Sequence, residues 1–83
     1  MPMKNLERNI SMYKDLVNGQ TGKQISSNYN VSPSRIFHLC RWLHRMISHY
    51  VDIPFQWDIE KIRSNNEFWC NASDRYLDHK KQL

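Results

Sequence analysis

Glycine and proline are scarce in this 83-residue sequence, which has two glycines and three prolines. A small all-β domain needs frequent tight turns that depend on these residues, so their scarcity argues against that class. The length allows one small domain, because a chain of this size buries only about 60–65% of its unfolded surface. Most enzyme scaffolds with a cofactor cleft are longer. We therefore expect a small all-α domain of four or five helices.

Long apolar runs are also missing. The longest is Phe68-Trp69-Cys70, far too short for a membrane span, and Met1 is not followed by the apolar stretch of a signal peptide. The two cysteines, Cys40 and Cys70, are too few for a disulfide framework. We expect a cytoplasmic protein with reduced thiols and no membrane contact.

Patterns typical of enzymes and metal sites are not found. The sequence has no phosphate-binding loop and no paired carboxylates, and Cys40 lies on a predicted buried stripe, where a thiolate is disfavoured. Cys40 and His44 are four residues apart, and Cys70 and His79 add two more possible zinc ligands. None of these pairs has the Cys-x-x-Cys spacing of common structural zinc sites. We expect no enzymatic activity, no metal and no cofactor.

Positive charge is in excess, and it is unevenly distributed along the chain. Lysine and arginine number 12 against 8 aspartate and glutamate residues, which gives a net charge of +4. Residues 1–50 carry a net charge of +5, and residues 51–83 carry −1. A basic half beside a nearly neutral half is typical of a polyanion-binding surface with a separate supporting segment.

Hydrophobic residues recur at helical spacing along most of the chain. The first such segment predicts a helix over residues 5–18. Thr21 is a suitable N-cap for a short second helix. Asn30 is suited to the left-handed turn that would end it.

A long third helix is predicted to begin after Ser32, with Pro33 at its first position, and to run to about Tyr50. Its predicted buried stripe comprises Ile36, Leu39, Cys40, Leu43, Ile47 and Tyr50. Its predicted basic face comprises Arg35, His38, Arg41, Arg45 and His49, with Phe37, His44 and Ser48 completing the polar arc. Trp42, at the edge of that face, is expected to pack beneath the C-terminal helices.

Two further helices are predicted in the C-terminal part. Asp58 is placed to cap a short helix that carries Ile59 and Ile62. Ser64, with Glu67 three residues later, fits a capping box and predicts a last helix to about His79. The predicted apolar face of this helix comprises Phe68, Trp69, Ala72 and Tyr76.

The stretch from residue 22 to residue 41 has the spacing of two helices that cross through a tight turn. The apolar residues at the crossing are Ile25, Tyr29, Val31, Ile36 and Leu39. This stretch resembles the helix-turn-helix of bacterial and phage transcription regulators, with Asn30 in place of the usual turn glycine and Ser26 in place of the usual alanine. Residues 31–36 are also similar to the DNA-reading end of sigma factors (region four).

The resemblance implies which residues contact double-stranded DNA. In this family the second helix of the motif lies in the major groove, and its N-terminal residues reach base edges. The implied base-reading residues are Ser34, Arg35, Phe37, His38 and Arg41. The implied phosphate-contacting residues are Thr21, Lys23, Gln24, Ser32 and Arg45.

Purely structural explanations stay open for the same residues. A three-helix bundle can match the spacing by chance. Arg35 can form a surface ion pair with Asp15 or another acid, and Phe37 belongs to the core if the third helix is rotated. His38 can be an ordinary solvated histidine.

We expect sequence-specific binding of double-stranded DNA by a small transcription regulator; packaging or recombination would use the same motif. Residues 1–83 are expected to form one domain, with the helix-turn-helix core in residues 5–50 and a supporting or partner-binding segment in residues 52–83. Trp57, Trp69 and Tyr76 are candidate anchors of a partner interface, including that of a homodimer. The alternative is a phage- or bacteria-encoded adaptor or inhibitor that binds RNA polymerase or another host protein through the sigma-like module.

Overall fold

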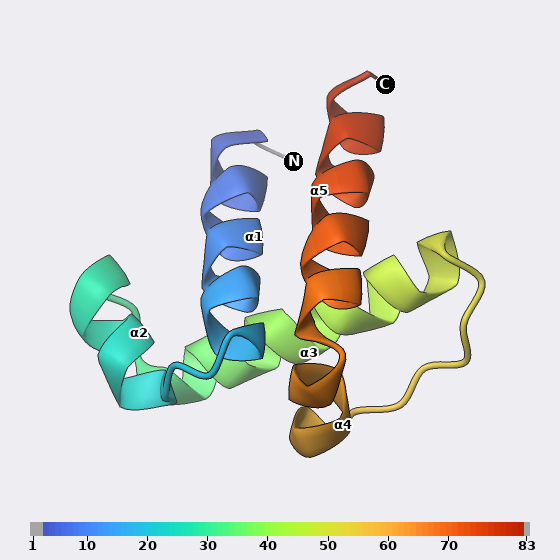
Figure 1. The fold of residues 1–83 in the computed structure, drawn as a ribbon. Coiled ribbons are helices and arrows are strands. Elements are labelled where there is room, and N and C mark those ends of the chain that lie inside the picture. The colour runs from blue at the N-terminus through green and yellow to red at the C-terminus, as the bar shows by residue number, and fades with distance from the viewer. Residues whose placement is uncertain (1–2, 83) are drawn as a thin grey trace.

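Five α-helices account for most of residues 3–82, the part of the chain that the computed structural model describes (Figure 1). They are α1 (Met3–Val17), α2 (Gly22–Tyr29), α3 (Pro33–Tyr50), α4 (Ile59–Ser64) and α5 (Asn66–Lys81). No strand occurs within these described residues, so the expected all-α class is confirmed. In the same range, no helix combines the length and the apolar character that crossing a membrane requires.

The helices form a crossed arrangement around α3. Figure 1 shows α1 and α5 side by side and antiparallel, with α3 running crosswise beneath both of them. α1 makes its most extensive contacts with α3 and α5, and α2 packs mainly on α3. The short helix α4 lies at the lower end of α5, where it also contacts α1. α3 therefore has one face turned toward the other helices and one face turned away from them.

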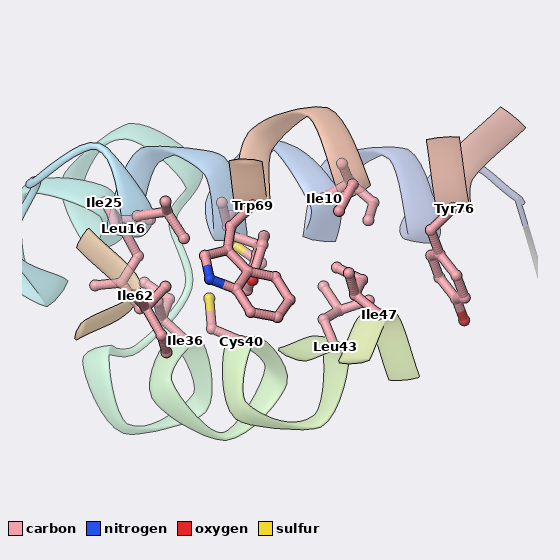
Figure 2. Packing of buried hydrophobic residues seen from close by; sticks show 14 residues of the cluster. Ile10, Leu16, Ile25, Ile36, Cys40, Leu43, Ile47, Ile62, Trp69 and Tyr76 are labelled. Carbon is pink, nitrogen blue, oxygen red and sulfur yellow. The ribbon is translucent and has the colours of Figure 1, made fainter. Parts of the chain in front are cut away.

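The core lies where α1, α3 and α5 meet (Figure 2). On α3 the fully buried apolar residues are Ile36, Cys40, Leu43 and Ile47. These four residues follow the i, i+4, i+7 spacing of one helix face, and the half-buried Leu39 and Tyr50 extend it. The predicted buried stripe of the third helix is thus confirmed.

Local capping signals place the helix boundaries around the turn between α2 and α3. The Thr21 side chain accepts a hydrogen bond from the Gln24 backbone N–H at 3.1 Å, and Gln24 Oε1 accepts one from the Thr21 N–H at 2.9 Å. Asn30 ends α2 in the left-handed region, with φ of 56°. Pro33 is the first residue of α3 as predicted, but the Ser32 side chain makes no capping hydrogen bond. The predicted boundaries of α2 and α3 are confirmed.

The boundary between α4 and α5 differs from the prediction. Asp58 caps α4, with its carboxylate accepting a hydrogen bond from the Lys61 N–H at 3.3 Å. Ser64 is not the N-cap of α5, because it is the last residue of α4 and its hydroxyl donates to the Lys61 carbonyl at 2.8 Å. Asn65 is the N-cap, without a side-chain hydrogen bond, and α5 extends to Lys81 rather than ending near His79.

The buried face of α5 is rotated slightly from the predicted one. Trp69, Ala72 and Tyr76 are buried as expected, whereas Phe68 is exposed. Ser73 is buried instead, because the contacting face follows the spacing 69, 72, 73 and 76.

Three predictions for side chains of α3 are also corrected, two in the polar arc and one at its edge. His44 and Ser48 are buried rather than exposed, and Trp42 is exposed rather than packed beneath the C-terminal helices. The segment over residues 51–58 leaves the end of α3 and returns toward α4, and its aromatic side chains pack on His44. This segment and α5 cover the side of α3 that carries His44, while Trp42 lies on the outer face beside Arg41 and Arg45.

Candidate nucleic-acid interface

The predicted base-reading residues all lie on the exposed side of α3. All five are exposed, and they occupy the first turns of the helix: Ser34, Arg35, Phe37, His38 and Arg41. Pro33 at the first helical position fixes the start of this face, and the buried stripe on the opposite side of α3 fixes its orientation. The predicted residues therefore lie on one accessible surface.

The predicted phosphate-contacting residues are exposed as well. Thr21, Lys23 and Gln24 lie at the start of α2, Ser32 directly precedes α3, and Arg45 lies further along α3. The capping box uses the acceptor atoms of Thr21 and Gln24, so the Thr21 hydroxyl and the Gln24 amide N–H groups remain as donors. Donors are what a phosphate oxygen requires.

The side chains of α2 and α3 that carry a full charge at pH 7 are all lysines and arginines. No acidic residue occurs between Asp15 and Asp52, a stretch that includes all of α2 and α3. The ion pairs within residues 3–82 are Lys14–Asp74 and Lys81–Glu7, so none of the α3 arginines takes part in one. Within the described residues, no ion pair therefore neutralises the α3 arginines, although Asp52 lines the same surface pocket as Arg45.

Arg35 and Asp15 do not form the ion pair that was considered for them. Asp15 instead accepts a hydrogen bond from the Tyr29 hydroxyl at 3.0 Å, which links α1 to the end of α2. Burial, reinforced by the neighbouring carboxylate, raises the pKa of Tyr29. Arg35 is exposed and available to an external anion.

Phe37 is neither a core residue nor a free surface residue. Its side chain is 41% exposed, and its ring lies against Gly22 at the start of α2. A Cβ atom at residue 22 would lie 2.6 Å from Phe37 Cε2, so the close approach depends on glycine. Phe37 thus joins the first turns of α2 and α3, and part of its ring still faces solvent.

We expect the Gly22→Ala substitution to lower the free energy of unfolding by about 1 kcal/mol, because the new methyl group must displace the Phe37 ring. In a Phe37→Ala background the same substitution should be neutral or stabilising, since alanine favours helix more than glycine does. Urea unfolding of the wild type, both single variants and the double variant measures this coupling. Equal effects of Gly22→Ala in the two backgrounds would contradict the contact.

His44 is the centre of a buried aromatic cluster that the sequence did not indicate. Its Nδ1 lies 2.8 Å from the Tyr13 hydroxyl, and its ring centroid lies 4.4 Å from that of Trp69 and 5.7 Å from that of Trp57. Burial lowers the pKa of His44 to about 4, against the opposing effect of a hydrogen bond to the Gln56 backbone. His44 is therefore a neutral hydrogen-bonding residue of the core at pH 7.

Two of the three candidate interface anchors are core residues. Trp69 is 8% exposed and Tyr76 is 4% exposed, so neither side chain is open to a partner in this fold. Trp57 is half-buried against His44. Their aromatic character alone gave no signal to distinguish an interface from a core.

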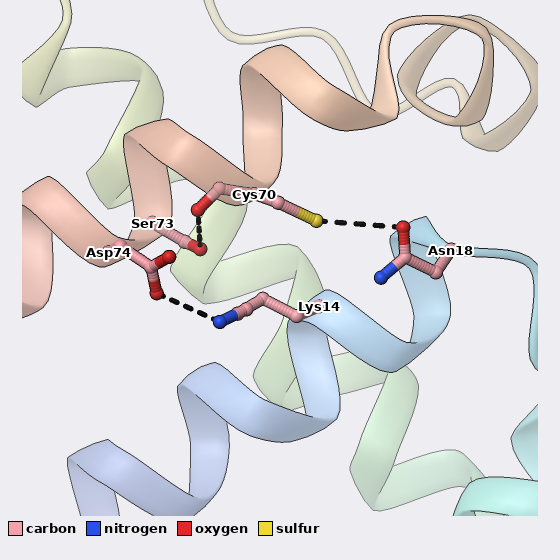
Figure 3. A network of polar contacts seen from close by, with 5 residues as sticks. All are labelled: Lys14, Asn18, Cys70, Ser73 and Asp74. Atoms are coloured by element: carbon pink, nitrogen blue, oxygen red, sulfur yellow. Dashed lines mark hydrogen bonds and ion pairs between the residues drawn. The ribbon is translucent and has the colours of Figure 1, made fainter.

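The cysteines and the remaining histidines do not gather into a site. Within residues 3–82, no group of three His, Cys, Asp or Glu side chains is close enough to hold a metal ion. Burial raises the pKa of the Cys40 thiol to about 12, which disfavours the nucleophilic thiolate. Cys70 Sγ lies 3.7 Å from Asn18 Oδ1, at the contact between α5 and α1 (Figure 3).

The C-terminal helices fix the position of α1 and of the loop that follows it. Arg63 Nε donates to the Leu16 carbonyl at 3.0 Å, and its Nη2 donates to the Gln20 carbonyl at 2.9 Å. These bonds satisfy carbonyl groups at and after the end of α1 with a positively charged donor. Lys14 and Asp74 form an ion pair at 2.9 Å between α1 and α5 (Figure 3). The segment leading into α2 is thus held by residues from the C-terminal part.

Comparison with protein-family models, curated proteins and solved structures finds no match to this chain. The functional assignment therefore rests on the chain's own residues and geometry. The feature that distinguishes this surface is the exposed, acid-free face of α3.

Proposed function

We propose that this chain binds double-stranded DNA sequence-specifically and acts as a small transcription regulator. The observation that carries the proposal is the outer face of α3. Its exposed arginines belong to a stretch of sequence that has no acidic residue between Asp15 and Asp52. DNA presents a dense row of negative charges, and such a face attracts it. The resemblance of residues 22–41 to a helix-turn-helix supports the same function.

In the proposed complex α3 enters the major groove. The groove of B-DNA is about 12 Å wide and accepts one α-helix. Arg35, His38 and Arg41 would reach base edges from the first turns of α3, and arginine is well shaped for bidentate contact with guanine. At 18 residues α3 is about 27 Å long, so its later turns would lie beyond the bases, beside the sugar–phosphate backbone. Arg45 belongs to that part.

The start of α2 would contact the backbone on the other side of the groove. Lys23 supplies a charge, and Thr21 and Gln24 supply hydrogen-bond donors. The N–H groups in the first turn of a helix also favour an anion. Arg63 and the Lys14–Asp74 pair would hold α1 and the loop before α2 in place during binding.

The Arg41→Ala substitution is expected to weaken binding to a specific duplex by about 1–3 kcal/mol, roughly 5- to 150-fold. Arg75→Ala is the matched control, because Arg75 is also an exposed arginine but lies on α5. The measurement is a fluorescence-anisotropy titration with a duplex selected from a random DNA pool. A wild type that shows no salt-sensitive binding to duplex DNA would contradict the proposal, as would equal losses for Arg41→Ala and Arg75→Ala.

The selection of duplexes from a random DNA pool also tests whether the protein forms a homodimer and whether it is a protein-binding adaptor instead. A palindromic selected sequence would favour a homodimer, since symmetric sites reflect symmetric proteins. An adaptor that binds RNA polymerase or another protein is supported by two exposed apolar side chains of the C-terminal part, Ile53 and Phe68. A stoichiometric complex with purified polymerase in the absence of DNA, together with no enrichment of any DNA sequence, would favour that alternative.

A further inference from the structure

A small pocket lies on the outer face of α3, at the end of the stretch that is expected to read bases. It is lined by His38, Arg41, Trp42 and Arg45 and has a volume of about 190 Å³. Sites that enclose a whole small molecule usually measure about 300–1,000 Å³. The pocket is therefore suited to one part of a larger ligand rather than to a free metabolite.

Trp42 gives this pocket an apolar wall. Its side chain is 44% exposed, although tryptophan is a residue that folded proteins largely bury. Its neighbours in the pocket are the cationic Arg41 and Arg45 and the imidazole of His38. A ligand that matches this combination has an apolar surface directly beside a negative charge. One deoxyribose–phosphate unit of DNA has both.

Phe55 holds the two arginines of the pocket in place. Its ring centroid lies 4.7 Å from Arg45 Cζ and 6.0 Å from Arg41 Cζ, which are distances of cation–π contact. The ring is itself fixed against the buried His44, at 5.9 Å between centroids. These contacts would restrict the guanidinium groups before a ligand binds and would so lower the entropic cost of binding.

We propose that this pocket holds one deoxyribose–phosphate unit of the bound duplex. Trp42 packs against the sugar and Arg45 binds the phosphate, while Phe55 is a positioning residue for Arg45 and for the base-reading Arg41. The inference rests on the proposed DNA-binding function and assigns to it three features outside the helix-turn-helix resemblance: the sugar-packing role of Trp42, the pocket that Trp42 lines, and the contribution of Phe55. An acidic protein partner would also satisfy the positive charges of Arg41 and Arg45. A loss of duplex affinity on Trp42→Ala would favour DNA over such a partner.

The test compares the affinity for a selected duplex at several salt concentrations. Trp42→Ala should weaken binding about 5- to 30-fold and leave the slope of log K against log salt unchanged, because an apolar contact releases no counterions. Arg45→Ala should weaken binding and also reduce the slope by about 1. Trp42→Phe should recover most of the loss. Phe68→Ala, which removes an exposed aromatic side chain from α5, is the matched control and should bind like the wild type.

The role of Phe55 is tested by its coupling to Arg45. Phe55→Leu should weaken duplex binding about 3- to 10-fold in the wild type and have little effect when Arg45 is already alanine. A purely structural role of Phe55 predicts the same loss in both backgrounds. Thermal unfolding followed by circular dichroism identifies any variant that is not folded at the assay temperature.

The outcomes distinguish this inference from the proposed function. If the wild type binds duplex DNA with strong salt dependence and Trp42→Ala binds equally well, the pocket is not a DNA site, while the proposed function stands. If Trp42→Ala lowers the salt slope as much as Arg45→Ala does, Trp42 acts only by supporting the arginines, and the sugar contact is wrong. If the wild type binds no duplex, both proposals fail.

Discussion

Replacing Trp69 with alanine is expected to lower the free energy of unfolding by about 3–5 kcal/mol. Trp69 projects from α5 into the centre of the core, between α5 and α3 (Figure 2). Its ring contacts that of His44 and packs edge-on against Phe68 at 5.0 Å between centroids. A domain of this size has a total stability of only about 4–12 kcal/mol, so this one substitution removes a large share of it.

Trp42→Ala is the matched control for this prediction. It removes the same side chain from the same protein, but at an exposed position on α3. We expect its effect on the free energy of unfolding to stay within about 0.5 kcal/mol. Urea unfolding followed by circular dichroism measures both variants without relying on tryptophan fluorescence. Similar losses for Trp69→Ala and Trp42→Ala would contradict the assignment of Trp69 to the core.

The helix boundaries that the sequence predicted correctly depend on local interactions. Thr21 and Gln24 are three residues apart, and Asn30 and Pro33 restrict the backbone at their own positions. Such effects act within one helical turn and do not require knowledge of the rest of the fold. The error at Ser64 has the same origin, because a second local hydrogen bond, to the Lys61 carbonyl, competes for its hydroxyl.

The burial of side chains at the edges of α3 could not be predicted in the same way. The periodicity of α3 defines the centre of its buried stripe, but its width depends on what packs beside it. His44 is covered by Phe55 and Trp57, which follow α3 in the chain, and by Trp69 from α5. Trp42 lies on the outer face of α3, where its side chain stays exposed.

The features of the candidate site also fall into two groups: those that the periodicity of α3 predicts and those that depend on the rest of the fold. Exposure of Arg35, His38 and Arg41 follows from the position of the buried stripe, so the sequence was sufficient to place them together. The contact between Phe55 and the α3 arginines joins residues in different elements and depends on the path of the 51–58 segment. No sequence spacing encodes that contact.

Acid is expected to destabilise the protein through His44, between pH 6.5 and about pH 4. The ordinary histidine pKa of 6.5 applies to the unfolded chain, and burial lowers the pKa of His44 to about 4 in the folded protein. Above pH 6.5 the imidazole is neutral in both states, so it causes no pH dependence there. As the pH falls through 6.5 the unfolded state takes up a proton that the folded state does not, and stability decreases until about pH 4. At about 1.4 kcal/mol for each pH unit of that interval, the loss attributable to His44 is about 3 kcal/mol.

The His44→Gln substitution separates this loss from the titration of carboxylates in the same range. Glutamine retains a hydrogen-bond acceptor for the Tyr13 hydroxyl but does not titrate. The variant should be less stable than the wild type at pH 7, because glutamine fills the aromatic cluster less well, and the difference should shrink by about 3 kcal/mol toward pH 4. His38→Gln, at an exposed position, is the matched control for a histidine-to-glutamine change outside the core. If His44→Gln and the wild type lose stability in parallel between pH 6.5 and pH 4, His44 does not stay neutral in the core. A converging pair of curves would instead establish that His44 remains buried and uncharged while the protein is folded.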